Sequence, residues 1–176
     1  PTTLLVGNEP NAIEPNGAPI SPADAVAKVK AIQAQCPQTK LVAGNVNADD
    51  WSVVGGYGSG YAWLKAFLEA YPAYNGAIGI HCYTQHSAQW CISQLAAMRR
   101  LYKGEMWVSE FGVLSQDGMQ MRRLLDYIKR NFSGAFVYTN RQPAEAYRDG
   151  WALQGADLIT ANGLTAAGKV YAEWTP

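Results

Sequence analysis

The sequence predicts an α/β fold in which parallel β-strands alternate with α-helices. Short apolar runs recur along the chain, and each is followed by a segment with apolar residues at helical spacing. Residues typical of helix ends stand at the borders of those segments. This order is typical of a parallel sheet covered by helices on one or both faces. The five apolar runs are residues 3–7, 40–43, 77–80, 106–109 and 135–138.

Each predicted helix is supported by its own spacing and end signals. After the first run, Ser21 is a capping residue, Pro22 occupies the first helical position, and Pro37 ends the segment, as Pro72 ends the next one. Gly58, Ser59 and Gly60 together indicate a loop. Further capping residues are predicted at Ser87, Asp117 and Thr165. The helical segments contain Val26, Val29 and Ile32; Tyr61, Leu64 and Phe67; Trp90, Leu95 and Met98; and Met121, Leu124, Leu125 and Ile128.

Composition and charge favour a globular domain with a neutral ligand. Of 176 residues, 48% are hydrophobic, which is enough for a sizeable core, and no linker divides the chain, so residues 1–176 are expected to form one domain. The 14 basic and 14 acidic residues balance and form no run, so neither nucleic acid nor an anionic membrane is an expected partner. The three cysteines, Cys36, Cys82 and Cys91, lack metal-ligand spacing and are expected to be buried.

Two glutamates each follow an apolar run, in the motifs Asn8-Glu9-Pro10 and Trp107-Val108-Ser109-Glu110. A lone carboxylate at the end of a buried strand is costly unless it is hydrogen-bonded, paired or left at the mouth of a pocket. In a parallel sheet the carboxyl ends of the strands lie on one side, so residues far apart in sequence can meet there. The two motifs therefore predict a carboxylate pair.

Together with His81-Cys82-Tyr83, these motifs resemble the retaining glycoside hydrolases of clan A, which are (β/α)8 barrels. The resemblance implies a partial TIM barrel containing strands four to eight with their helices. It further implies that Glu9 is the general acid/base, that Glu110 is the nucleophile, and that Asn8 hydrogen-bonds a sugar 2-hydroxyl. Such enzymes hydrolyse β-glycosidic bonds without a cofactor or metal, and the neutral charge favours a neutral oligosaccharide or glucan as substrate.

Strand alternation places other candidate residues around this pair. His81 and Tyr83 share one face of their strand, so both point to the pocket if Cys82 points to the helices. Tyr83 would then hold Glu110, whereas His81 is either a contact of substrate or carboxylate or a hydrogen-bonded core residue. Sugar contacts are also candidates at Asn45, Trp51, Tyr138 and Trp151, each with a structural alternative in a loop or the core. Core packing is expected for Trp63, Trp90, Trp107 and Trp174.

A complete barrel of this type contains eight units in about 250 residues, whereas this chain contains five. The runs at residues 4–6 and 136–138 would form open sheet edges, against which we expect another polypeptide. The alternatives are a truncated enzyme, a split enzyme completed by a separate chain, and an oligomer of half barrels. Two other functions stay open: a non-catalytic carbohydrate-binding half barrel and an unrelated α/β domain. The sequence contains neither a glycine-rich phosphate loop nor a Gly-x-Ser-x-Gly motif.

Overall fold

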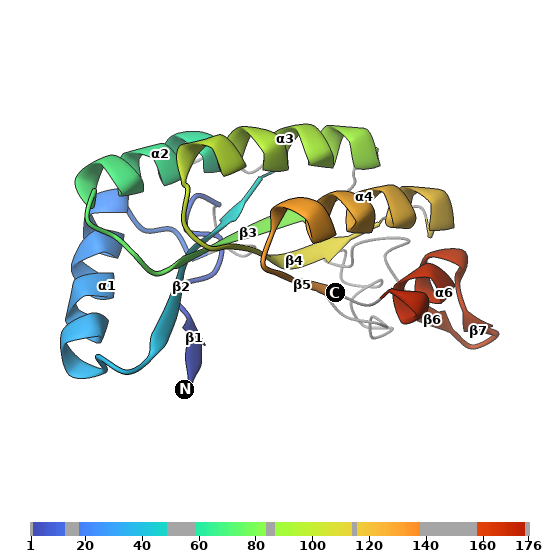
Figure 1. Ribbon diagram of the computed structural model, residues 1–176, viewed down its shortest axis with the longest axis horizontal. Coiled ribbons are helices and arrows are strands. Elements are labelled where there is room, and N and C mark those ends of the chain that lie inside the picture. Colours follow the sequence, from blue (N-terminus) through green and yellow to red (C-terminus); the bar gives the residue numbers. More distant parts are fainter. Residues whose placement is uncertain are drawn as a thin grey trace.

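The computed structural model describes residues 2–12, 18–48, 59–83, 87–113, 116–137 and 158–174. Five parallel strands pair in sequential order and curve as part of a barrel wall (Figure 1). Every strand pairing in this sheet is parallel, which confirms the predicted α/β fold and partial TIM barrel. The strands are β1 (Thr3–Leu5), β2 (Lys40–Asn47), β3 (Ala77–Tyr83), β4 (Met106–Gly112) and β5 (Gly134–Val137).

Helices follow the strands and cover one face of the sheet (Figure 1). They are α1 (Pro22–Gln35), α2 (Gly60–Ala70), α3 (Ala88–Leu101), α4 (Gly118–Asn131) and α6 (Ala166–Glu173). A side-chain oxygen caps the first turn of each of them, at Ser21, Ser59, Ser87, Asp117 and Thr165. The cap at Ser59 was not predicted, because the glycines on both sides indicated a loop. No helix in the described part of the chain is both long enough and apolar enough to cross a bilayer.

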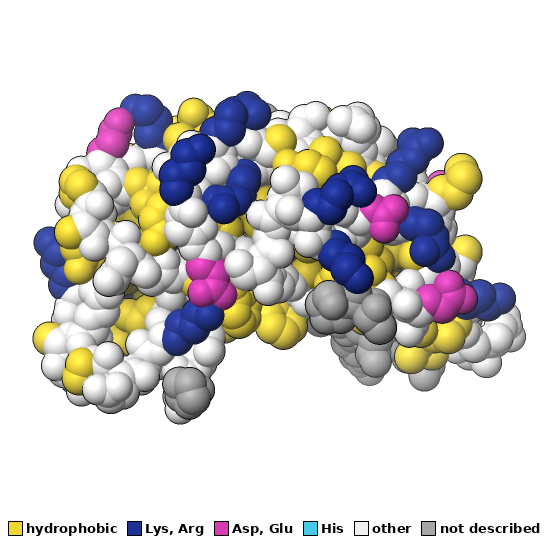
Figure 2. All heavy atoms as spheres, viewed as in Figure 1, with side chains coloured by type: hydrophobic (Ala, Val, Ile, Leu, Met, Phe, Trp, Pro, Cys, Tyr) yellow, Lys and Arg dark blue, Asp and Glu magenta, His cyan; other side chains and the backbone are white. Residues whose placement is uncertain are grey.

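The hydrophobic core fills the space between the helices and the sheet. Ile78 and Ile80 of β3 are fully buried there, and the rings of Trp63 and Phe67 on α2 stack with centroids 5.5 Å apart. Trp63 is therefore a core residue, as predicted, while Trp90 and Trp174 are partly buried against the core. On the outer surface, Lys and Arg side chains are spread among neutral and hydrophobic ones, with a few acidic ones between them (Figure 2).

Three strands extend further than the sequence predicted. The apolar runs ended at residues 43, 80 and 109, whereas β2, β3 and β4 continue to Asn47, Tyr83 and Gly112. Their pairing shifts between Gly44 and Val46, and again next to His81, as it does at a β-bulge. The additional residues include polar ones, because their side chains line the inner face of the barrel wall instead of the core.

Two further features differ from expectation or were not predicted. Cys82 and Cys91 are buried, as expected, and form a disulfide that was not predicted, whereas Cys36 is exposed, so the expectation of burial was wrong for that residue. The bond joins β3 to α3. A short antiparallel hairpin, β6 (Ile159–Thr160) and β7 (Gly163–Leu164), precedes α6 and lies outside the main sheet.

Candidate active site

Glu9 lies in a tight turn after β1. Its φ of 42° is in the left-handed region, which is uncommon for a residue with a side chain and which requires support from the surroundings. That support comes from two backbone hydrogen bonds: the Glu9 N–H donates to the carbonyl of Asn45 at 3.0 Å, and the Ala12 N–H donates to the carbonyl of Glu9 at 2.9 Å. Glu9 is 6% exposed, so its carboxylate is directed into the molecule.

Asn11 fastens the same turn to β2. Its Nδ2 donates to the carbonyl of Asn47 at 3.0 Å, and the Asn47 N–H donates back to its Oδ1 at 2.9 Å. The Asn11 side chain thus pairs with the backbone of Asn47 in the way that a neighbouring β-strand would. Asn11 is buried. The sequence reasoning missed Asn11, because an asparagine after Glu-Pro is equally typical of an exposed turn.

Glu110 lies on β4, and its carboxylate lies close to that of Glu9. The Tyr83 hydroxyl donates a 2.6 Å hydrogen bond to Oε2 of Glu110. Nδ1 of His81 lies 3.1 Å from Oε1 of Glu9 and 3.5 Å from Oε2 of Glu110, so the imidazole stands between the two carboxylates. The predicted strand alternation of His81 and Tyr83 is confirmed, since Cys82 between them binds to α3.

The burial of Glu9, His81 and Glu110 and the distances between their polar atoms determine which chemistry these three side chains can perform. The side chains of His81 and Glu9 are 2% and 8% exposed, while that of Glu110 is 29% exposed and faces the open side of the sheet. One oxygen of each glutamate and a nitrogen of His81 all lie within 4.8 Å of one another, so among the described residues these three could together hold a cation. Two carboxylates at this spacing can share proton transfer and nucleophilic attack at one carbon atom.

Asn45 does not take the substrate-binding position that we expected. It is 1% exposed, and both hydrogens of its amide are used, on the carbonyls of Val6 (3.2 Å) and Val42 (3.1 Å). Its Oδ1 accepts a 2.7 Å hydrogen bond from the Ser109 hydroxyl. Asn45 on β2 therefore connects the segment after β1 to β4, and its amide has no hydrogen left to donate to a sugar.

The remaining candidates are placed as follows. Asn8 is exposed next to Glu9, and its carbonyl accepts from the Ala18 N–H at 2.9 Å. Trp51, Tyr138 and Trp151 lie outside the described residues.

Trp107 does not pack under the helices, contrary to expectation. Its neighbours Met106 and Val108 belong to the core, so Trp107 points to the inner face of the sheet. There the centroid of its ring lies 5.6 Å from that of the Phe136 ring. Its Nε1 donates to Glu105 at 2.6 Å, and Lys40 binds the same carboxylate at 2.7 Å. The hydrogen bond from Lys40 is the main reason why the pKa of Glu105 is lowered, and the one from Trp107 adds to it.

The five parallel strands and their helices form part of a (β/α)8 barrel. Residues 1–171 match the family described as glycosyl hydrolase catalytic core, and the chain belongs to that family. No curated protein sequence matches significantly.

Solved structures of low sequence identity share the fold. A GH128 endo-β-1,3-glucanase from Lentinula edodes is 18% identical, with a TM-score of 0.70 over 96% of this chain and 68% of its own. A GH128 exo-β-1,3-glucanase from Aureobasidium namibiae is 17% identical, with a TM-score of 0.67 over 97% of this chain and 66% of its own. A fungal β-1,4-galactanase is 14% identical, with a TM-score of 0.64 over 99% of this chain and 62% of its own. The chain thus spans about two thirds of the length of these proteins.

Proposed function

We propose that this chain carries the catalytic pair of a retaining β-glycosidase, with Glu9 as general acid/base and Glu110 as nucleophile. The proposal depends mainly on one observation: His81 lies within 3.1 and 3.5 Å of the two carboxylates. Retaining enzymes keep their carboxyl groups about 5 to 5.5 Å apart, whereas inverting enzymes need about 6.5 to 9.5 Å to admit a water molecule. Carboxylate oxygens within 4.8 Å favour the first class.

Hydrolysis would proceed in two displacements. An oxygen of Glu110 attacks the anomeric carbon while the glycosidic C–O bond breaks and Glu9 gives its proton to the leaving oxygen. A water molecule then attacks the same carbon, Glu9 takes a proton from that water, and the ester bond to Glu110 breaks. Two inversions at one carbon leave the product with the β-configuration of the substrate.

The surrounding side chains have separate tasks in this scheme. The Tyr83 hydroxyl holds Oε2 of Glu110, which leaves Oε1 to attack, and it stabilises the carboxylate that departs in the second step. Nδ1 of His81 lies 3.1 Å from Oε1 of Glu9 and donates to it in the tautomer that carries a hydrogen on Nδ1. To Asn8, which is exposed next to Glu9, the proposal assigns the binding of a sugar hydroxyl.

A neutral β-linked glycan is the proposed substrate class. The chain has no net charge, and the structural neighbours include enzymes named for β-1,3-glucan and β-1,4-galactan. β-1,3-Glucan is therefore the first polymer to test, with β-1,4-galactan beside it.

Covalent trapping tests this proposal. A 2-deoxy-2-fluoro-β-glucosyl donor with a good leaving group forms the glycosyl ester but hydrolyses slowly. Peptide mass spectrometry should then locate the sugar on Glu110, and Glu110→Gln should abolish the label. Glu105→Gln is the matched control, since Glu105 precedes the same strand at its other end. Label on any other carboxylate would contradict the assignment, and saturable glycan binding without label or turnover would favour the carbohydrate-binding alternative.

We also propose that further polypeptide covers the open sheet. In the described part of the chain, β1 pairs only with β2 and β5 only with β4. Leu4, Leu5 and Phe136 on these outer strands are 42%, 44% and 49% exposed. Apolar edges of this kind favour pairing with another segment, a partner or a second copy. Light scattering that gave a stable monomer of 19.1 kDa, with both edges accessible to hydrogen exchange, would contradict this.

A further inference from the structure

Three polar atoms that carry lone pairs converge between β3, β4 and the turn after β1. Nδ1 of His81 lies 3.1 Å from Oε1 of Glu9 and 3.5 Å from Oε2 of Glu110, and all three atoms lie within 4.8 Å of one another. Two ionised carboxylates repel each other at this distance, and a positive charge between them relieves the repulsion. A hydrogen on Nδ1 can do this, and so can a metal ion bound to the same lone pair.

The chemistry of these ligand atoms favours a transition metal. One imidazole nitrogen with two carboxylate oxygens is a donor set that zinc accepts, whereas magnesium and calcium prefer oxygen alone. In a tetrahedral zinc site, bonds of about 2.0 to 2.2 Å set neighbouring ligand atoms about 3.3 to 3.6 Å apart. The distances from His81 to the two glutamates, 3.1 and 3.5 Å, are close to this spacing.

Two of the three ligands are already held in place. The side chains of His81 and Glu9 are 2% and 8% exposed, and the turn that carries Glu9 is fixed by backbone hydrogen bonds. The side chain of Glu110 is 29% exposed, which leaves it room to move toward Glu9. Its Oε2 accepts the hydrogen bond of the Tyr83 hydroxyl, and a bond of this kind orients a metal-binding carboxylate. A fourth coordination position is left for a water molecule.

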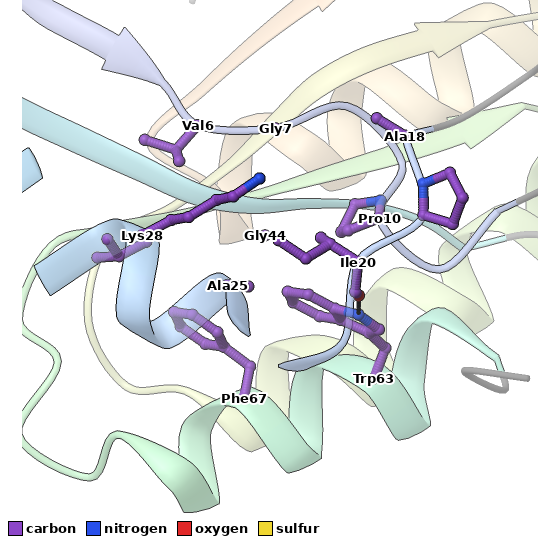
Figure 3. A pocket seen from close by; sticks show the side chains of 12 residues that line it. Val6, Gly7, Pro10, Ala18, Ile20, Ala25, Lys28, Gly44, Trp63 and Phe67 are labelled. Atoms are coloured by element: carbon purple, nitrogen blue, oxygen red, sulfur yellow. Dashed lines mark hydrogen bonds between the residues drawn. The ribbon is translucent and has the colours of Figure 1, made fainter. Parts of the chain in front are cut away.

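The described residues contain no other group of three such ligands within this distance. A cavity of about 340 Å³ beside α1 and α2 is the contrasting case (Figure 3). No histidine, cysteine, aspartate or glutamate is among the described residues that line it, and Lys28, which does line it, would repel a cation. A metal ion is therefore expected at the carboxylates and not in this cavity.

We propose that Glu9, His81 and Glu110 bind a zinc ion, which inhibits hydrolysis by occupying the catalytic pair. An ion on Oε1 of Glu9 takes the place of the proton that the leaving oxygen needs. An ion on Glu110 reduces the negative charge with which that carboxylate attacks the anomeric carbon. The inhibition rests on the proposed glycosidase function, whereas the zinc site itself does not.

Calorimetric titration with zinc chloride tests the site without any hydrolysis. All proteins carry Cys36→Ser, which removes the exposed free thiol as a competing ligand. We expect saturable binding of zinc and no binding of magnesium under the same conditions. His81→Gln should weaken zinc binding by at least about tenfold. His86→Gln, which replaces the other of the two histidines in the sequence, is the matched control and should leave the affinity unchanged.

A second pair of variants replaces a carboxylate. Glu110→Gln retains the size of a partly exposed side chain, so the fold should be kept even if His81→Gln is unstable. It should also weaken zinc binding by at least about tenfold, whereas Glu69→Gln, at an exposed position of α2, should not. Circular dichroism establishes that each variant is folded.

The affinities of these variants decide the zinc site. Equal affinity in the parent protein and in the folded variants of His81 and Glu110 would overturn it and indicate an adventitious ion only. A loss in His86→Gln as large as that in Glu110→Gln would overturn this set of ligands.

Covalent labelling tests the inhibition separately. At saturating zinc, the fluorinated glucosyl donor should no longer label Glu110, and removal of the zinc with EDTA should restore the label. Full labelling at saturating zinc would overturn the inhibition. Absence of label without zinc would contradict the glycosidase proposal and with it the inhibition, while calorimetry would still decide the zinc site.

Discussion

The hydroxyl of Tyr83 on β3 lies 2.6 Å from Oε2 of Glu110 on β4, and it donates a hydrogen bond to that carboxylate. The two strands are neighbours, and their register sets His81 opposite Glu110. Strand β3 thus supplies two side chains, His81 and Tyr83, that contact the proposed nucleophile. The position of the carboxylate is determined by strand pairing as much as by its own rotamer.

We predict that Tyr83→Phe lowers kcat on the hydrolysed glycan by about 10- to 100-fold with little change in KM. The hydroxyl orients Glu110 and stabilises it as it leaves, which affects the chemical steps more than binding. Tyr102→Phe is the control, because its hydroxyl binds the carbonyl of Gly76 at 2.7 Å, away from the carboxylates. An unchanged kcat in Tyr83→Phe would contradict this role.

Gly79 should tolerate no larger residue. A Cβ there would lie 2.0 Å from Oδ1 of Asn45 and 2.7 Å from Oγ of Ser109. We expect Gly79→Ala to lower the free energy of unfolding by about 2 to 4 kcal/mol, since both neighbours are buried and hydrogen-bonded. In Gly134→Ala the nearest atom would be 3.6 Å away, so urea denaturation should show a change within about 0.5 kcal/mol.

Removing the hydroxyl that binds Asn45 should also destabilise the sheet. Ser109→Ala leaves Oδ1 of Asn45 buried without its 2.7 Å donor, at an expected cost of about 1 to 3 kcal/mol. Ser93→Ala removes an exposed helical hydroxyl that binds the carbonyl of Gln89, and its effect should be within about 0.5 kcal/mol. Equal midpoints for the two variants in urea denaturation would contradict the structural role of Asn45.

The buried phenol of Tyr74 should make the stability of the protein depend on pH in the alkaline range. Burial raises the pKa of its phenol above the usual value of about 10, because the charged form would lose its hydration. The contribution of the neutral phenol to stability is complete below that usual value and is lost as the pH rises toward the higher pKa of the folded state.

When the pH is raised from 9 to about 11, the free energy of unfolding should therefore fall less in Tyr74→Phe than in the parent protein. At pH 7 the same variant should be less stable by about 1 kcal/mol, because it lacks the bond to the carbonyl of Ala77 at 2.8 Å. Urea denaturation at each pH measures both effects. Parallel pH profiles for the two proteins would contradict the assignment.

Particular residues explain which parts of this structure the sequence could predict. Ser21, Ser87, Asp117 and Thr165 were predictable as caps, because capping depends on groups two or three positions away in the chain. Glu9, His81, Tyr83 and Glu110 were found from their motifs and their positions after apolar runs.

The role of Asn45 could not be predicted in the same way. Its partners Val6 and Ser109 lie on other strands, and their meeting depends on a bulge after Gly44 that no local pattern indicates. Asn11 was missed for the same reason, because its partner is the backbone of β2. Trp107 was misplaced because the pairing shifts between Val108 and Phe111, which lets Glu110 share the inner face with it.

The turn that holds Glu9 is bonded to β2 and not to the three-residue edge strand before it. This turn should therefore stay folded in solution for as long as β2 does. Opening of β1 at the edge exposes the Val6 amide, which donates to the carbonyl of Val42 at 2.8 Å, while the Glu9 amide remains bonded to Asn45. Hydrogen exchange of the Glu9 amide should accordingly be slow and should match that of β2. The proposed acid can then keep its position while β1 opens.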